Sequence, residues 1–326
     1  MANLAASRTS LASRVLRGHW GIGETPIRTH LGVSRITWQI GSLYWLSQAE
    51  QSRHAELFEQ TELLSDLGRY LKEERSSILV PEIIPSEGGR LLEVDQGYVW
   101  CLTRNLAGFH PNVADPGIYS ALAQGLASFH LALRRFSEHQ ATHVPDGIGV
   151  RTRQNIGRLA SAIFSAFTSD PREKDLLQQA GAWLLPRLDR FERLPRQIVH
   201  GDWTPRNVLF DRDGPSCGLT GILDFEAMAT DPVCADVGNT CSTLLMWSGL
   251  DRVDERIADV LDTYERSAGV HLELGDIHTA MLAHWLSHYW CWRDRLRFGE
   301  FGHEVKDRLC LRISSVLSYV STGSGS

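Results

Sequence analysis

The chain has 326 residues, enough for two closely packed lobes that each have a core. Hydrophobic residues make up 43% and charged residues 22%, as in ordinary globular enzymes. The formal charge of −6 argues against a nucleic-acid partner, and no segment has the roughly 18–20 apolar residues that cross a bilayer. We therefore expect neither a nucleic-acid partner nor a membrane partner.

The six cysteines are scattered and form no C-x-x-C pair, so we expect reduced thiols in a cytoplasmic protein. The first 20 residues contain Ser and Arg but no acid, which is typical of a transit peptide. The alternative, which we favour, is an amphipathic first helix with Leu4, Leu11, Val15 and Leu16 facing inward.

Residues 27–48 alternate as strands do, with Gly41-Ser42 between two short runs, and predict a β-hairpin. The apolar spacing predicts a helix over residues 51–74, with Leu57, Leu63, Leu64, Leu67 and Leu71 on its inner face. Three further strands are predicted at Ile78–Ile84, Arg90–Val94 and Tyr98–Thr103, separated by glycine-containing turns. Residues 1–105 therefore predict a small lobe built on an antiparallel sheet.

From Pro116 onward the pattern is mainly helical. The predicted helices are Ile118–Phe136, two within residues 151–194, and then 251–268, 276–297 and 303–320. Short strands are predicted at Gln197–Val199, Asn207–Phe210 and Gly221–Phe225. We expect a large helical lobe over 109–320 and a disordered Ser/Gly-rich tail over 321–326.

Residues 199–236 carry the most informative pattern. Asp202 is followed five residues later by Asn207 and then by an apolar strand, and a second apolar strand ends at Asp224. Phosphoryl transfer needs hard oxygen ligands for Mg²⁺ and a carboxylate that orients and deprotonates the attacking hydroxyl. Asn207 and Asp224 suit the metal, and Asp202 suits the hydroxyl.

Each residue also has a structural interpretation when taken alone. An isolated H-G-D can be a capped turn, Asp224 the end of a strand, and Asp236 a helix N-cap. Coincidence of all of them at these spacings is much less probable than any one alone. His130 is different, because a packed, hydrogen-bonded core histidine explains it best.

The run His200–Asn207 with Leu223–Glu226 resembles the catalytic loop and metal-binding segment of the aminoglycoside phosphotransferase and choline kinase family. The segments Asp231–Gly238 and Leu126–His130 are similar to that family's later elements. The resemblance covers roughly residues 80–240 and implies an α+β, two-lobed, protein-kinase-like fold. It implies Asp202 as base, Asn207 and Asp224 as Mg²⁺ ligands, and His200 and Asp236 as supports of the catalytic loop.

The resemblance also implies a nucleotide site. Gly32 and Ser34 match the family's small-residue loop over the phosphates, and a hinge at about 103–108 would place Thr103, Arg104, Asn105 and Leu106 against the base of ATP or GTP. The chain departs from the pattern after Tyr44-Trp45-Leu46, where Ser47 stands in place of the usual phosphate-binding Lys or Arg. Arg35 and Arg53 are the candidate replacements, and Glu59 or Glu62 is the candidate helix carboxylate.

The predicted helix 276–297 carries a cluster of aromatic and cationic residues. Ordinary core packing explains most of them, but the resemblance implies that this region helps form the acceptor pocket. His284 and His288 have metal-compatible spacing and lack a third ligand nearby in the sequence, so a zinc site is not favoured. The residues expected to contact the acceptor are Trp203, Glu226, Trp290 and Arg293.

We therefore expect a kinase that transfers the γ-phosphate of ATP or GTP, bound with Mg²⁺ between the lobes, to a hydroxyl of a small molecule. An antibiotic of aminoglycoside or nucleoside type, or a related glycosylated metabolite, is the expected acceptor. The alternatives are a metabolic kinase of choline, homoserine or fructosamine type and a catalytically weak, pseudokinase-like binding module. A metal-dependent hydrolase is a further, less favoured alternative.

Overall fold

The computed structural model describes residues 2–31, 35–115, 117–139, 144, 170–212, 218–247, 253–296 and 302–322. It divides into two compact units. Unit 1 comprises residues 1–108 and 220–226, and unit 2 comprises 109–219 and 227–326. The division expected from the sequence differs in one respect, since it assigned residues 220–226 to the helical part.

Unit 1 contains a five-stranded antiparallel sheet in the order β1-β2-β3-β5-β4. Its register sets Trp38 opposite Leu46 and Leu46 opposite Leu102, so one face of the sheet is continuously apolar. The predicted hairpin is confirmed, and Gly41 takes φ +55 in its turn. The strands are β1 (Ile27–Leu31), β2 (Ile36–Ile40), β3 (Tyr44–Glu50), β4 (Glu93–Asp95) and β5 (Tyr98–Arg104).

The strand predicted at Ile78–Ile84 is wrong. The segment makes isolated bridges at Leu79 and Ile83 and forms no continuous strand. Pro81 lies between them and has no N–H to donate to a ladder, which explains the interruption.

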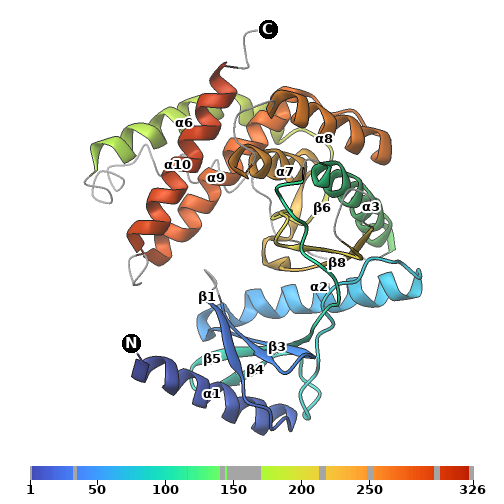
Figure 1. Cartoon of the computed structure of the whole chain (residues 1–326), viewed down its shortest axis with the longest axis vertical. Helices are drawn as coiled ribbons and strands as arrows, with labels where there is room; N and C mark the ends of the chain where they lie inside the picture. The colour runs from blue at the N-terminus through green and yellow to red at the C-terminus, as the bar shows by residue number, and fades with distance from the viewer. Residues whose placement is uncertain are drawn as a thin grey trace. The chain divides into compact units, whose positions relative to one another are not determined.

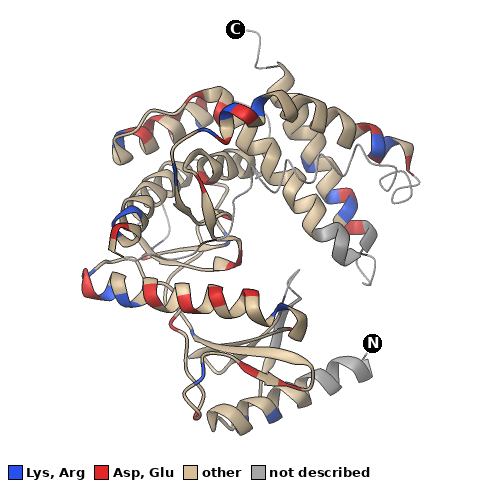
Figure 2. Ribbon diagram, turned by 180° about the vertical axis from the view of Figure 1, so that it is seen from behind, with Lys and Arg blue, Asp and Glu red and all other residues tan. Residues whose placement is uncertain are grey.

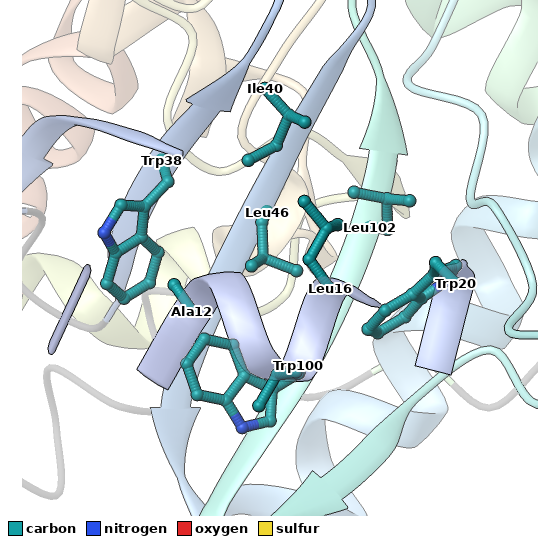
Figure 3. Close-up of a cluster of buried hydrophobic side chains, with 9 residues drawn as sticks. Ala12, Leu16, Trp20, Trp38, Ile40, Leu46, Trp100 and Leu102 are labelled. Carbon is teal, nitrogen blue, oxygen red and sulfur yellow. The ribbon is translucent and has the colours of Figure 1, made fainter. Parts of the chain in front are cut away.

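Helix α1 (Ala2–Trp20) covers the apolar face of the sheet. Figure 3 shows Leu16 of the helix lying over Leu46 and Leu102 of the strands. The prediction that Val15 and Leu16 face inward is confirmed, because both are fully buried. Leu11 packs against the same cluster, whereas the side chain of Leu4 lies outside the described part of the chain.

Helix α2 (His54–Glu73) follows a 3₁₀ turn, η1 (Gln51–Arg53). All five leucines predicted to lie on its inner face are buried. Acidic residues follow its outer side, as Figure 2 shows. Leu57 and Thr61 of the helix line a small cavity with Ser47 and Cys101 of the sheet, so α2 covers the face of the sheet opposite to α1.

Unit 2 is mainly helical (Figure 1). Its helices are α3 (Ile118–His139), α6 (Pro171–Phe191), α7 (Cys234–Trp247), α8 (Val253–Ala268), α9 (Leu274–Leu296) and α10 (Gly302–Thr322). One of the two helices predicted within 151–194 is thus α6, and the other falls on residues outside the described ranges. Four residues of the predicted tail, 323–326, also lie outside them.

Short strands surround the loop that carries the sequence motif. Strand β6 (Arg196–Val199) precedes the loop and pairs antiparallel with β9 (Ala229–Pro232), and β7 (Val208–Phe210) follows the loop. Strand β8 (Leu219–Ile222) begins in unit 2 and continues into unit 1. It ends three residues earlier than predicted, because Asp224 has φ +59 and η2 (Phe225–Ala227) begins after it.

Helix α7 was not predicted, and it lies at the centre of unit 2, in contact with α3, α8, α9 and α10. Its interior polar residues hide the apolar period, because Thr240, Ser242 and Thr243 are buried with their hydroxyls donating to carbonyls one turn earlier. At Gly238, α7 packs closely against α9, since a Cβ there would lie 2.5 Å from the Cβ of Ala280. None of the helices in the described ranges is long and apolar enough to cross a membrane.

Candidate active site

The loop between β6 and β7 presents Asp202 on the surface of unit 2. Asp202 is half-buried, and its carboxylate accepts a 2.8 Å hydrogen bond from Nδ2 of Asn207. The same Nδ2 donates to the backbone carbonyl of Asp202 at 2.9 Å, and Asn239 of α7 donates to Oδ1 at 3.4 Å. These bonds hold the carboxylate in one orientation, as the positioned base of a transfer reaction requires.

Asn207 fits the role of a metal ligand. Both of its N–H bonds are directed at Asp202, so the amide oxygen is the atom left to meet a cation. Amide and carboxylate oxygens are the ligands that Mg²⁺ accepts.

The carboxylate of Asp236 supports the loop from below. Asp236 is fully buried, and its two oxygens accept the backbone N–H groups of His200 at 2.8 Å and Gly201 at 2.7 Å. Burial alone would raise the pKa of this carboxyl. The hydrogen bond and charge of His130, with the charge and backbone N–H of His200, outweigh burial and lower its pKa below the ordinary value.

His130 joins this support to a second helix. Its Nε2 lies 2.9 Å from Asp236 and its Nδ1 lies 2.7 Å from the hydroxyl of Tyr264 on α8. The side chain of His130 is 2% exposed, so the prediction of a hydrogen-bonded core histidine is confirmed. Burial raises the pKa of Tyr264 far above its usual range, so its hydroxyl remains protonated in the network.

Gly201 is required at its position in the loop. Its φ is +81, a conformation that residues with a Cβ rarely adopt. A Cβ at this position would overlap the backbone carbonyl oxygen of Ala227. The loop therefore passes so close to the end of η2 that no side chain fits.

Helix α9 brings two histidines to Asp202. One ligand atom each from Asp202, His284 and His288 lies within 4.8 Å of the other two. The two imidazole rings are 4.3 Å apart between centroids, and His284 is almost completely buried. The third metal-compatible side chain, which the sequence did not show near the histidines, is thus Asp202, 82 residues before His284 along the chain.

Arginines gather on the same side of unit 2. The guanidinium of Arg312 on α10 lies 4.4 Å from the ring centroid of Trp285, next to the histidines. Burial first, and then the charges of Arg206 and Arg308, lower the pKa of Arg312, while the charge of Asp202 opposes this shift. Arg312 therefore lies close enough to Asp202, and to two other arginines, for their charges to act on it.

Asp224 lies in unit 1, at the end of the segment that β8 carries there. The backbone of this segment is tied to Leu79, which donates to Thr220 at 2.8 Å and accepts from Ile222 at 2.9 Å. Asp224 is exposed and left-handed, a conformation that Asp and Asn tolerate better than most residues. Strained positions of this kind cluster at functional sites.

Arg35 lies beside Ser47, the position at which the family usually has a Lys or Arg. It lines the small cavity beside Ser47 and Cys101, and it pairs with Glu226 at 3.4 Å and with Gln60 of α2 at 3.2 Å. A cation between the sheet and the α2 helix is thus present, supplied by the residue that precedes β2. Arg53 instead pairs with Glu56 on the surface of α2 at 2.7 Å.

The predicted hinge residues are well fixed in unit 1. The backbone N–H of Arg104 donates to Glu82 and that of Asn105 donates to Leu43. The side chain of Asn105 accepts from the indole of Trp45 at 2.9 Å and donates to Ser42 at 3.1 Å. A base bound at this connector would therefore be recognised by backbone carbonyls or by N–H groups from Leu106 onward.

Three of the residues predicted to contact the acceptor have other environments. Trp203 is fully buried and stacks on Phe129 at 5.8 Å, so it supports the loop from inside and is not a surface contact. Trp290 is 5% exposed and packs edge-on against Tyr289, as the packing interpretation predicted. The carboxylate of Glu226 pairs with Arg35.

The remaining predicted site residues are Thr103, Gly32, Ser34 and Arg293. Thr103, the second-last residue of β5, is half-buried, with its hydroxyl 3.4 Å from the carbonyl of Trp45. Gly32, Ser34 and the side chain of Arg293 lie outside the described part of the chain. Sequence reasoning missed the contact of Asp202 with His284 and His288, for which only the i, i+4 spacing of the two histidines was a signal.

Comparisons with known proteins agree with this architecture. The model of the phosphotransferase enzyme family (APH) matches residues 34–294. A homoserine kinase of Zymomonas mobilis subsp. mobilis (strain ATCC 31821 / ZM4 / CP4) is 27% identical over 182 residues, which is 55% of this chain and 52% of that protein. The chain thus matches about half the length of this curated relative.

Solved structures match over nearly the whole chain. The microcompartment-associated aminopropanol kinase has a TM-score of 0.67 at 15% identity, covering 96% of this chain and 98% of that one. Aminoglycoside 2'-phosphotransferase-IIIa, in its GDP complex, has a TM-score of 0.65 at 14% identity, covering 95% and 98%. Amicoumacin kinase, in complex with AMP-PNP and Ca²⁺, has a TM-score of 0.67 at 13% identity, covering 96% of each chain.

The predicted α+β, protein-kinase-like fold is therefore confirmed. With a family model matched from residue 34 to residue 294, the chain belongs to the phosphotransferase enzyme family.

Proposed function

We propose that this protein transfers the γ-phosphoryl group of ATP or GTP to a hydroxyl of a small acceptor, with Asp202 as the base. The observation that carries the proposal is the fixed Asp202 carboxylate, which Asn207 holds at 2.8 Å on a loop braced by Asp236. A base held in this way orients the acceptor hydroxyl and takes its proton as the new P–O bond forms and the bond from the γ-phosphorus to the leaving nucleoside diphosphate breaks.

We assign Asn207 and Asp224 as ligands of the nucleotide's Mg²⁺. A bound Mg²⁺ would neutralise charge on the phosphate oxygens. We assign Arg35 to the phosphates in place of the absent Lys, because it alone of the two candidates lies beside Ser47. Complexes of related kinases with GDP and with AMP-PNP and Ca²⁺ support a nucleotide co-substrate held with a divalent cation.

The arginines near Asp202 favour an acceptor that carries an anionic group. Arg206, Arg308 and Arg312 place positive charge on this side of unit 2. A polycationic acceptor would be repelled by these side chains, whereas a carboxylate or phosphate group would pair with them. The homoserine kinase likeness points the same way, since homoserine carries a carboxylate as well as a hydroxyl.

An aminoglycoside is the second candidate, supported by the structural neighbours that act on such compounds. Kinase action on an antibiotic would make the protein a resistance factor. Free thiols at Cys101, Cys234 and Cys241, all buried, fit a cytoplasmic location.

A phosphorylation panel tests the function. The wild-type chain is incubated with Mg²⁺ and γ-labelled ATP or GTP, with hydroxylated amino acids, sugar acids, aminoglycosides, nucleoside antibiotics or amino alcohols as acceptors. We expect a labelled product from an anionic acceptor, and a kcat lower by about 10²–10⁴ in Asp202→Asn. Arg312→Gln should raise KM for that acceptor more than it changes kcat.

Turnover of aminoglycosides alone would reject the anionic acceptor and leave the kinase assignment intact. Phosphate release to water, with no acceptor labelled, would indicate a hydrolase. Binding of nucleotide without any turnover would indicate the pseudokinase-like module.

A further inference from the structure

We propose that Asp202, His284 and His288 form a second metal site, separate from the magnesium site of the nucleotide, which takes a borderline transition-metal ion such as Zn²⁺. An ion bound there occupies the carboxylate that would receive the acceptor proton. Zinc is therefore an inhibitor of the proposed transfer reaction, acting at the base.

The ligand set is the first argument. Two imidazoles and one carboxylate match zinc and other late divalent ions, whereas Mg²⁺ prefers sites made of oxygen alone. Three protein ligands with an open position are typical of zinc sites that exchange a fourth ligand with solvent or substrate. The same set would not hold the nucleotide's Mg²⁺ in preference to Zn²⁺.

The distances are the second argument. Zinc with ligand bonds of about 2.0–2.2 Å in a tetrahedron separates two ligand atoms by about 3.3–3.5 Å. The three ligand atoms lie within 4.8 Å of one another, so closing on the ion requires shifts of about 1 Å. The half-buried His288 can supply such a shift by side-chain rotation, toward the buried His284 and the fixed Asp202.

The rigidity of the surroundings is the third argument. Asp202 is oriented by Asn207 and Asn239, so the carboxylate is already fixed before an ion arrives. His284 is 1% exposed, which restricts its ring. Preorganised ligands lose little conformational entropy on binding.

One feature of the surface opposes the ion. The guanidinium of Arg312 lies next to the histidines over Trp285, and a positive charge there repels a dication. Removing the Arg312 charge should therefore change zinc affinity and the affinity for an anionic acceptor in opposite directions. Arg312→Gln should tighten zinc binding and weaken acceptor binding.

Metal binding is measured on the full chain, stripped with a chelator and free of nucleotide, with Zn²⁺ by equilibrium dialysis and with Co²⁺ by its visible absorption. We expect one equivalent bound by the wild type and its loss in His288→Ala and His284→Gln. His278→Ala is the matched control, because His278 is a buried histidine on the same helix that packs on Tyr319 outside this cluster. It should bind the metal as the wild type does.

Inhibition provides a second readout, with excess Mg²⁺ and nucleotide and with each rate divided by that variant's own rate without zinc. We expect at least about a 10-fold higher inhibitory zinc concentration for His288→Ala than for the wild type or His278→Ala. Because His284 is buried, its variant is used only if its melting curve shows a folded protein, and the half-buried His288 carries the test otherwise.

Stoichiometric binding that persists in His288→Ala and His284→Gln would overturn the proposal. Absence of a bound equivalent in the wild type would also overturn it. A wild type that binds zinc at these residues but phosphorylates no acceptor would support the metal site and reject the proposed function, so the two failures are distinguishable.

Discussion

Asp236 and Gly201 are joined by a 2.7 Å hydrogen bond between a buried carboxylate and a backbone N–H, 35 residues apart in the chain. No residue with a side chain can replace this glycine without changing the path of the loop, because of its positive φ and its contact with Ala227. The position of Asp202, one residue later, therefore depends on a side chain that has no contact with a substrate. This dependence leads to the first three predictions.

Replacing Asp236 should damage both stability and turnover. Asp236→Ala leaves two buried backbone N–H groups and His130 without their acceptor, which should lower the free energy of unfolding by about 3–5 kcal/mol. The loosened loop should lower kcat by about 100-fold. Urea denaturation and initial rates check the two effects.

Asp276→Asn is the control for Asp236→Ala. Asp276 is also buried and pairs with the largely exposed Arg190, but within the described part of the chain it makes no hydrogen bond or ion pair with the catalytic loop, so its replacement should leave turnover near the wild-type value. Full turnover in a folded Asp236→Ala protein would contradict the bracing role.

The decrease in the free energy of unfolding at acid pH should depend on Asp236. Its pKa in the folded protein lies below the ordinary 3.8, so on acidification the unfolded chain takes up the proton first. The stabilisation is complete above that value and is lost as pH falls through the folded pKa. Unfolding free energies from about pH 6 down to about pH 2 should therefore fall less steeply below about pH 4 in Asp236→Asn than in the wild type. Parallel curves over the whole range would show that another carboxylate dominates.

Gly201→Ala should lower kcat far more than the positive φ of Gly201 alone predicts. The methyl group meets the carbonyl of Ala227, so the loop must move and kcat should fall by about 100-fold. Gly269→Ala is a matched control with φ +66 and no atom within 4 Å of the added Cβ. It should lose about 1 kcal/mol of stability and retain full turnover. Equal behaviour of the two variants in steady-state kinetics would refute the steric argument.

Asp224→Asn separates metal binding from folding. Asn also tolerates the left-handed conformation, so the free energy of unfolding should change by less than about 0.5 kcal/mol. Loss of the negative charge should raise the Mg²⁺ concentration for half-maximal rate by about 10-fold or more. A magnesium titration at fixed nucleotide measures this, and an unchanged midpoint would remove Asp224 from the proposed ligands.

Arg35→Gln should raise KM for the nucleotide by about 10-fold, because the variant removes the cation beside Ser47. Arg53→Gln removes a cation of η1 that pairs with Glu56 of α2, and KM should stay near the wild-type value. Nucleotide titrations at saturating acceptor compare the two. The reverse order would transfer the role to Arg53.

The sequence predicts the parts of this fold whose burial is one-sided. Helix α2 has a regular apolar stripe and all its predicted core leucines are buried. Helix α7 was not recognised, because a helix surrounded by other helices has no polar face and satisfies Thr240 and Ser242 internally. The segment at Pro81 shows the opposite error, where apolar residues suggested a strand that the missing N–H prevents.

At the site, local spacing was informative and long-range contacts were not. The step from Asp202 to Asn207 could be predicted, since the loop closes within five residues. The approach of His284 to Asp202 depends on how α7 packs against α9, which no short motif encodes. The sequence offers both Arg35 and Arg53 as the cation, and only the folded structure shows that Arg35 lines the cavity beside Ser47.

Because Gly238 has no side chain, helix α7 can pack closely against helix α9. Helix α7 carries Asp236, which sets the height of the catalytic loop, and α9 carries His284 and His288, which face the loop. The two helices touch at Gly238, so even one methyl group would push the histidines away from the loop. The contact between α7 and α9 at Gly238 should accordingly tolerate no larger residue.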